Sequence, residues 1–219
     1  MNLPLTLTVV PFNLTPISFS VPNSNWNDTT LTGAAITFLP FPAGTDFVAA
    51  LIDAAGVDAG PVSSIITVDD SDDTSCLASG ALTTPSRYSV NGSLAQCAPF
   101  DVVYDPDDSA GMTAPPDVRA FVPGNSSIAV NCTAGSGESG RVTFVMDVLA
   151  GQEVVLTFTD STGYHQATGP LLVQGDTQSP SDCLKSRIVD VQPDARMMNM
   201  TNGTMTDTTT TKRPAPLSK

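Results

Sequence analysis

The sequence predicts an all-β protein built from two tandem antiparallel β-sandwiches of the immunoglobulin or fibronectin-III type. The first observation behind this prediction is an internal repeat. Residues 44–77 align without a gap on residues 151–184, at a constant offset of 107 residues, and seven of the 34 aligned positions are identical. The second is a series of short apolar runs with a period of two residues, separated by Pro, Gly, Asn and Asp. Roughly seven such strands per copy, without a convincing amphipathic helix, are typical of a sandwich.

The strands of the first copy are expected, in chain order, at residues 3–9, 17–21, 36–38, 47–52 and 62–68. Apolar residues alternate with Thr or Ser in the first three runs, whereas the last two are more continuously apolar and predict buried strands. Asp53 and Gly56 follow the fourth run. Because Asp accepts hydrogen bonds within its own turn and Gly readily adopts a positive φ, we expect a hairpin connection there.

The second copy repeats this plan, with strands expected at residues 100–104, 118–122, 128–130, 142–148, 154–159 and 169–173. Asp160 and Gly163 stand where Asp53 and Gly56 stand in the first copy, which predicts the same turn twice. Residues 49–55 alone could be drawn as a helix. Their aligned counterpart begins as a clear strand, so the repeat favours a strand in both copies.

The repeat divides the chain into four segments. We expect a first sandwich at residues 1–77, a linker at 78–96, a second sandwich at 97–192 and a disordered tail at 193–219. The tail is rich in Thr, contains Pro and has few apolar residues that could form a core.

The chain is acidic, with a net charge of −13, and 14% of its residues are charged. Nucleic-acid binding needs clustered Lys and Arg, so this balance excludes it. No apolar run is long enough for a transmembrane helix and no leader is visible, so we expect no membrane insertion by this chain. The dense acidic run at 69–73 lacks the spacing of a calcium loop and predicts a solvated loop.

Sequons for N-glycosylation are frequent, and their number predicts a secreted or cell-surface glycoprotein. They begin at Asn13, Asn27, Asn91, Asn125, Asn131, Asn199 and Asn202. Pro16 follows the first of them, which makes Asn13 the least suitable acceptor.

The four cysteines are placed at the ends of the copies. Cys97 opens the second copy and Cys183 closes it, so we expect a disulfide that joins the two ends of that sandwich. Cys76 occupies the closing position of the first copy, whose opening counterpart would fall before Met1. The first sandwich is therefore expected to lack its first strand. Cys76 and Cys132 are left either paired with each other or free, because four cysteines allow three pairings.

Several of these motifs resemble one known group of proteins. The opening Gln96-Cys97-Ala98-Pro99, the repeated Asp-x-x-Gly turn, and the closing Ser75-Cys76-Leu77 and Asp182-Cys183-Leu184 are similar to those of fungal, chiefly basidiomycete, surface glycoprotein ectodomains. The resemblance covers about residues 3–185 and extends more distantly to the Ser/Thr-rich GPI-anchored cell-wall family. It implies a small β-sandwich fold and an extracellular or cell-surface location, and it transfers no catalytic residues.

Three functional hypotheses follow. The first is a non-enzymatic glycoprotein with a structural or adhesive role at a fungal cell surface or wall, whose partners are cell-wall polysaccharide or surface proteins. The second is a carbohydrate-binding module in which Trp26 or Tyr164 stacks on a sugar ring. The third is a secreted hydrolase that uses His165, the single histidine, as a general base. We favour the first hypothesis. We expect no enzyme activity, because no nucleophile motif accompanies His165. We also expect no cofactor and no metal, because the sequence has no close cysteine pair that could bind zinc with His165.

Overall fold

The computed structural model describes residues 3–21, 39–72, 75–77, 86–105, 114–132, 140–176 and 178–187. The protein is all-β, as predicted, and every pairing between named strands is antiparallel. A short 3-10 helix, Asp182–Arg187, follows the strands. In the described part of the chain, no helix is both long and apolar enough to cross a membrane.

The strands form three sheets. The first sheet has the order β2-β1-β3-β4 and consists of β1 (Leu5–Pro11), β2 (Ile17–Val21), β3 (Asp46–Ile52) and β4 (Ile66–Thr67). The middle sheet has the order β11-β10-β7-β8, with β12 also paired to β10. Its strands are β7 (Asp117–Phe121), β8 (Ser127–Val130), β10 (Glu153–Thr159), β11 (His165–Ala167) and β12 (Leu171–Leu172). The third sheet, β5-β6-β9, consists of β5 (Tyr88–Asn91), β6 (Pro99–Tyr104) and β9 (Arg141–Val145).

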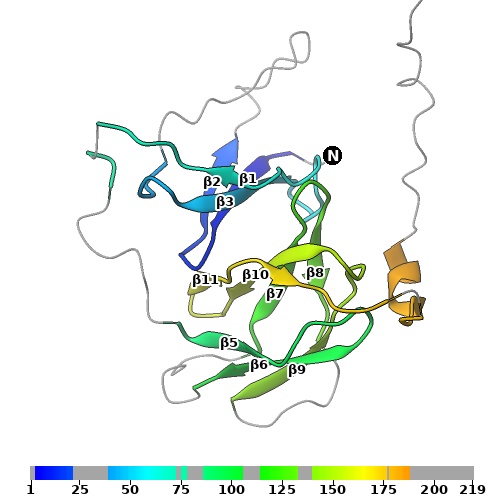
Figure 1. Cartoon of the computed structure of the whole chain (residues 1–219). Coiled ribbons are helices and arrows are strands. Elements are labelled where there is room, and N and C mark those ends of the chain that lie inside the picture. The colour runs from blue at the N-terminus through cyan, green and yellow to red at the C-terminus, as the bar shows by residue number, and fades with distance from the viewer. Residues whose placement is uncertain are drawn as a thin grey trace, which may run out of the picture. The chain divides into compact units, whose positions relative to one another are not determined.

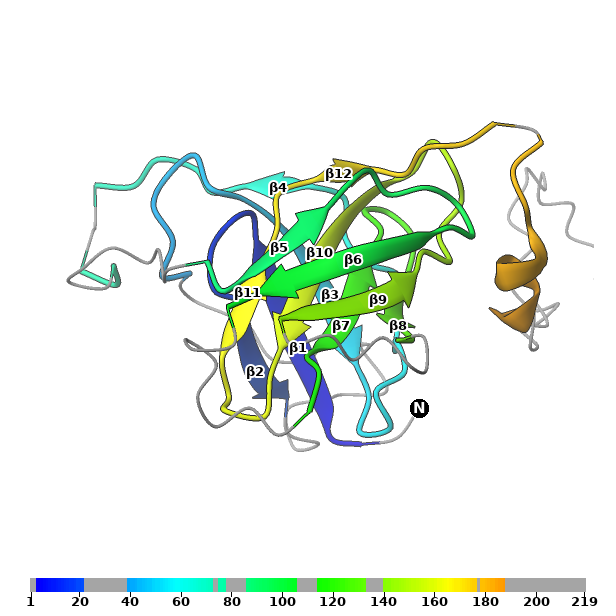
Figure 2. The same ribbon diagram turned by 90° about the horizontal axis from the view of Figure 1, so that it is seen from below.

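These sheets stack as three layers, with β7 and β10 in the central one (Figures 1 and 2). The larger core lies between the third and the middle sheet, where Phe100 and Phe144 meet Leu156 and Phe158. A smaller core lies between the first and the middle sheet and joins Val10 and Val48 with side chains of β7 and β10. The chain up to Ser186 belongs to one compact unit.

Strand β10 shows why the middle sheet is central. Val154 and Leu156 point into the larger core, whereas Val155 points into the smaller one, and all three are fully buried. A strand that is buried on both faces has a continuous apolar sequence rather than an alternating one. The run Val-Val-Leu-Thr-Phe in β10 therefore matches its position between two cores.

The internal repeat is visible in the register of the strands. Val9 pairs with Ala49 and with Ile17 in the first sheet, and Ala120 pairs with Leu156 and with Ile128 in the middle sheet. The order β2-β1-β3 thus repeats as β8-β7-β10 with the same pairing. The Asp-x-x-Gly turns are also confirmed in both copies. In each, the Asp Oδ1 accepts two backbone N–H groups and the Gly has a positive φ, 78° at Gly56 and 82° at Gly163.

The gapless alignment is wrong in the segment that directly follows this turn. The backbone N–H of Ser63 donates to Ala49, as that of Thr168 donates to Leu156, so these residues correspond at an offset of 105 rather than 107. The first copy therefore contains two additional residues before this point. Its predicted buried strand at 62–68 is also shorter than expected: only Ile66–Thr67 is a strand, and Ile66 is exposed.

The two copies contact each other through equivalent surfaces. The N–H of Asn13 donates to the carbonyl of Thr168, and the N–H of Gly124 donates to the carbonyl of Ser63. A second pair of bonds, Ala167 to Leu14 and Val62 to Asn125, is related in the same way. This reciprocity, in which each copy uses one patch to bind the same patch of the other, is the pattern of a two-fold interface. Here it lies within one chain.

The predicted linker at 78–96 is wrong over the part of it that is described. Tyr88–Asn91 forms β5, which pairs with β6, and Tyr88 is buried in the larger core. The expected strand at 36–38 and the tail at 193–219 lie outside the described residues.

The cysteines are arranged as follows. Cys97 and Cys183, the pair that the sequence favours, are joined by a disulfide. Cys76 and Cys132 are exposed free thiols. The disulfide closes a separation of 86 residues, for which the chain-entropy account gives a stabilisation of about 4–5 kcal/mol.

Candidate functional site

A polar groove opens between the first sheet and the middle sheet. At one end, these two sheets touch through the apolar residues of the smaller core. Toward the other end, their facing side chains become polar: Thr8 and Ser18 on the first sheet, and Arg119, Thr157 and Thr159 on the middle sheet. Period-two alternation places these residues on the same sheet faces as the core residues, so the groove continues the core outward.

The groove has a volume of about 550 Å³. The first sheet and its β1–β2 turn line it with Thr8, Pro16, Ser18 and Ile52, and the middle sheet contributes chiefly Asp117, Arg119, Asn131, Thr157, Thr159 and His165. This volume lies within the ~300–1,000 Å³ of typical small-molecule pockets. The lining offers hydroxyl, carboxylate, amide and imidazole groups beside a few apolar ones.

Three of the polar side chains form a row across the middle sheet. Thr159 pairs with His165 of β11 on one side and with Asp117 of β7 on the other. Directly paired residues point to the same face, so this register gathers the three groups along one wall. The Thr159 hydroxyl lies 3.0 Å from Nδ1 of His165. Asn131 follows β8 directly and extends the lining at the opposite edge.

Arg119 connects the two copies at the base of the groove. Its guanidinium donates to the Ser127 hydroxyl at 2.6 Å and to the carbonyl of Gly56 at 2.8 Å. It also lies 3.8 Å from the carboxylate of Asp58, which accepts hydrogen bonds from Ser127. The charge is therefore neutralised within the protein, and the guanidinium acts mainly as a link between layers.

This chemistry suits a neutral, hydroxyl-rich ligand. Hydroxyl, amide and imidazole groups can both donate and accept hydrogen bonds, whereas an anionic ligand would meet the Asp117 carboxylate. Glycoside hydrolysis commonly needs two carboxyl groups, about 5–10 Å apart. Among the described residues that line the groove, Asp117 is the only one with a carboxylate. His165 lies in the groove, but its Nδ1 faces a threonine hydroxyl.

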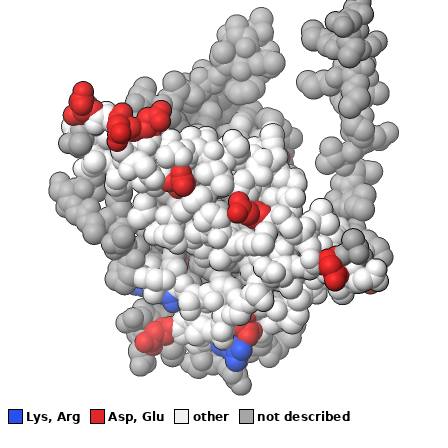
Figure 3. Space-filling model, in the orientation of Figure 1, with Lys and Arg blue, Asp and Glu red and all other residues white. Residues whose placement is uncertain are grey.

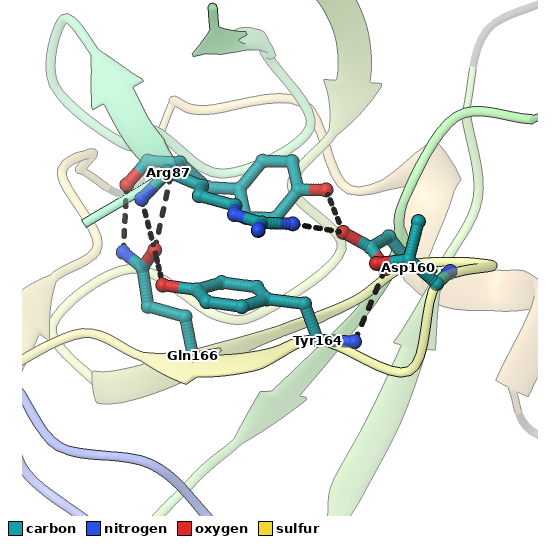
Figure 4. Close-up of polar contacts among 6 residues, drawn as sticks. Arg87, Asp160, Tyr164 and Gln166 are labelled. Atoms are coloured by element: carbon teal, nitrogen blue, oxygen red, sulfur yellow. Dashed lines mark hydrogen bonds and ion pairs between the residues drawn. The ribbon is translucent and has the colours of Figure 1, made fainter. Parts of the chain in front are cut away.

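Tyr164, which the sequence marks for sugar stacking, belongs to a different cluster (Figure 4). The Arg87 guanidinium covers one face of its ring, 4.4 Å from the centroid, and the ring of Tyr88 lies 6.0 Å away. Its hydroxyl lies 3.3 Å from Oε1 of Gln166. Gln166 in turn accepts the backbone N–H groups of Arg87 and Tyr88. Tyr164 thus packs β11 against β5, and we place the candidate site in the groove instead.

Asp160 holds the other side of this cluster. Its carboxylate accepts the Tyr88 hydroxyl at 2.8 Å and lies 3.7 Å from the Arg87 guanidinium. Burial by itself would raise the pKa of Asp160, but the hydrogen bonds from Thr162, Tyr88 and Tyr164 lower it below its ordinary value. Burial and the same hydrogen bond to Asp160 raise the pKa of Tyr88. These shifts describe a carboxylate that stays ionised and structural.

The remaining predicted residues are distributed over the surface. Trp26 lies outside the described residues, as do the sequons at Asn27, Asn199 and Asn202. The other four sequon residues are exposed, and they are Asn13, Asn91, Asn125 and Asn131. The face in Figure 3 is mostly uncharged, with scattered acidic groups. Among the described residues, no group of three or more His, Cys, Asp or Glu side chains is arranged to hold a metal ion.

Sequence reasoning found His165 but missed the groove that contains it. The Thr and Ser residues of β1 and β2 predict a polar strand face, which is ordinarily a solvated one. That this face lies against a second sheet depends on how the copies pack. The available signal was the continuous apolar run in β10, which marks a strand with a second sheet on its other face.

The chain was compared with known proteins. No protein-family model matches it, and no curated protein does. Among solved structures, it is similar to SGBP-B of the Bacteroides ovatus mixed-linkage glucan utilization locus, in complex with a mixed-linkage heptasaccharide, with a TM-score of 0.28 and 9% sequence identity. The match covers 78% of this chain and 37% of that one. The chain therefore spans little more than a third of that protein's length, and a similarity of this degree gives no basis for transferring a ligand.

Proposed function

We propose that the protein is a non-enzymatic extracellular glycoprotein with an adhesive role at a fungal cell surface or wall, and that it binds a neutral glycan through the polar groove. The observation that carries the binding proposal is the groove itself. It combines hydroxyl groups from both sheets and the Asn131 amide with a volume suited to a short stretch of sugar units.

The composition of the groove also predicts a weak interaction. Lectin-like sites gain much of their affinity from exposed aromatic rings, and the one aromatic residue in the described lining, Phe121, is 1% exposed. We therefore expect dissociation constants on the order of 0.1–1 mM for single oligosaccharides, or about 4–5.5 kcal/mol of binding free energy. Weak sites are useful in adhesion when many copies act together on a polymer.

The test is glycan binding by the full chain and a matched pair of variants. Ser18 and Ser20 are both exposed on the same side of β2, but only Ser18 lines the groove. Ser18→Val should weaken binding of soluble β-glucan, xylan or chitin oligosaccharides about tenfold in titration calorimetry or ligand-observed NMR. Ser20→Val makes the same chemical change outside the groove and should leave binding unaltered.

Four outcomes would contradict parts of this proposal. Equal binding by both variants would show that the glycan binds elsewhere on the surface. If none of these sugars binds, the proposal of a glycan ligand is wrong. Release of new reducing ends during incubation would show that the protein is an enzyme. Mass spectrometry of the secreted protein should find glycans on exposed sequon residues outside the groove, which are Asn13, Asn91 and Asn125. Bare Asn at every sequon would contradict the glycoprotein assignment.

A further inference from the structure

The outer face of the first sheet corresponds to a face that is fully covered in the second copy. The register relates Leu7, Ile17 and Phe19 of the first sheet to Val118, Ile128 and Val130 of the middle sheet. The latter three face the larger core and are 3%, 8% and 6% exposed. Leu7, Ile17 and Phe19 are only partly buried.

The difference arises from what lies above each face. In the second copy, the covering layer is the third sheet, whose Tyr88, Phe100 and Val102 enter the core. The corresponding cluster on the first sheet is formed by that sheet and its adjoining loops, and no residue of another described strand joins it. In Figure 1, the third sheet lies beyond the middle sheet, and no described strand occupies the matching position beyond the first sheet.

The cysteine positions follow the same correspondence. The Cys183 sulfur lies 3.8 Å from the carbonyl oxygen of Met146, which also accepts the backbone N–H of Cys97 at 2.7 Å. The Cys76 sulfur lies 3.7 Å from the carbonyl oxygen of Leu39. Both sulfurs are 37 residues from their carbonyl partner. Cys76 thus stands where Cys183 stands, as an exposed free thiol at the edge of a half-covered apolar face.

We propose that this face docks an amphipathic β-hairpin of a partner polypeptide, and that a cysteine of the hairpin forms a disulfide with Cys76. The second copy defines the chemistry of this partner. The partner hairpin presents apolar residues at alternate positions, as β5 and β6 do. Its cysteine lies just before its second strand, as Cys97 precedes β6. Its backbone N–H would bind the carbonyl oxygen of Leu39, as that of Cys97 binds Met146.

The covalent step is a thiol–disulfide exchange. The partner cysteine arrives as a mixed disulfide with a small thiol such as glutathione. The Cys76 thiolate attacks the partner sulfur, the new S–S bond forms as the old one breaks, and the glutathione thiolate that leaves takes up the proton lost by Cys76. No further oxidant is consumed.

A peptide copied from the second sandwich can test the proposal. The probe is a synthetic peptide of residues 86–105 whose Cys97 carries glutathione, added to the intact, disulfide-bonded protein. Its control is the same peptide with Phe100→Ser and Val102→Ser, which keeps the cysteine but removes two apolar anchors. Mass spectrometry after acid quenching should find the peptide on Cys76, at least tenfold faster than the control peptide. Cys132, which is also exposed, should react equally slowly with both.

A variant of the face separates docking from simple thiol reactivity. Phe19→Ser removes an apolar side chain of the face and should slow capture of the peptide at Cys76. The exchange of Cys76 with oxidised glutathione, which releases one reduced glutathione, should be unchanged. Equal rates for the two peptides, or equal capture at Cys76 and Cys132, would overturn the proposal. A Cys76–Cys132 bridge in the secreted protein would also overturn it, as would a dimer that buries the face against a second copy.

Discussion

At the scale of single residues, Asp160 shows how the repeated turn was adapted in the second copy. Asp53 and Asp160 both accept backbone N–H groups of their own turn. Asp160 additionally accepts the hydroxyl of Tyr88, whose ring packs in the larger core beside Phe158. A local turn signal is thereby connected to the strand that the sequence assigned to a linker.

The lowered pKa of Asp160 makes the free energy of unfolding depend on pH in the acidic range. A carboxylate whose pKa is lower in the folded than in the unfolded protein stabilises the fold above its unfolded pKa of about 4. We expect the free energy of unfolding to fall as the pH drops below that value, because protonation removes the carboxylate acceptor. The measurement is urea unfolding between pH 7 and pH 2.5.

A pair of tyrosine variants assigns this effect. Tyr88→Phe removes one hydrogen bond to Asp160 and should cost about 1–2 kcal/mol at pH 7. It should also reduce the loss between pH 5 and pH 3, since the pKa of Asp160 rises toward its unfolded value. Tyr104→Phe deletes a hydroxyl from the neighbouring ring and is the matched control. If both variants show the same dependence of the free energy of unfolding on pH, Asp160 is not the cause of the loss of stability in acid.

At the scale of secondary structure, local patterns predict strands well and their partners poorly. β3 and β10 were predictable because each is a largely apolar run that ends at an Asp-x-x-Gly turn. β5 was missed because its four residues, Tyr88–Asn91, lie in a Ser-rich stretch that Gly80, Pro85 and Gly92 interrupt. The groove was missed because a polar strand face looks the same whether it contacts water or lines a cleft.

The contact between the first and the middle sheet can be tested at Phe121. This side chain is 1% exposed and lies in the smaller core with Val10 and Val48. Phe121→Ala should lower the free energy of unfolding by about 3–5 kcal/mol through lost burial and the cavity it leaves. Leu172→Ala, on a residue that is 53% exposed, should change stability by less than about 0.5 kcal/mol. A comparably small effect at Phe121 would show that the two sheets do not pack together in solution.

At the scale of the whole molecule, the repeat predicts two separate sandwiches. In the structure, the two copies are joined because the middle sheet contributes side chains to both cores. β10 belongs to both cores, Arg119 joins β7 to the loop after β3, and four reciprocal backbone hydrogen bonds cross between the copies. A duplicated sequence indicates that two copies exist. How the copies pack depends on the side chains on the facing sides of the first and the middle sheet. Those side chains, Val48 and Val155 among them, turn two repeats into one layered unit.

We therefore expect a single cooperative unfolding transition. Scanning calorimetry should give one peak whose calorimetric and van't Hoff enthalpies agree, because the smaller core cannot persist when either flanking sheet unfolds. Reducing Cys97–Cys183 should lower the free energy of unfolding by about 4–5 kcal/mol without splitting the peak. Two separate transitions would instead support independent sandwiches. The groove could then not be a fixed binding site, since its two walls belong to different copies, and Ser18→Val would lose its rationale as a test of glycan binding.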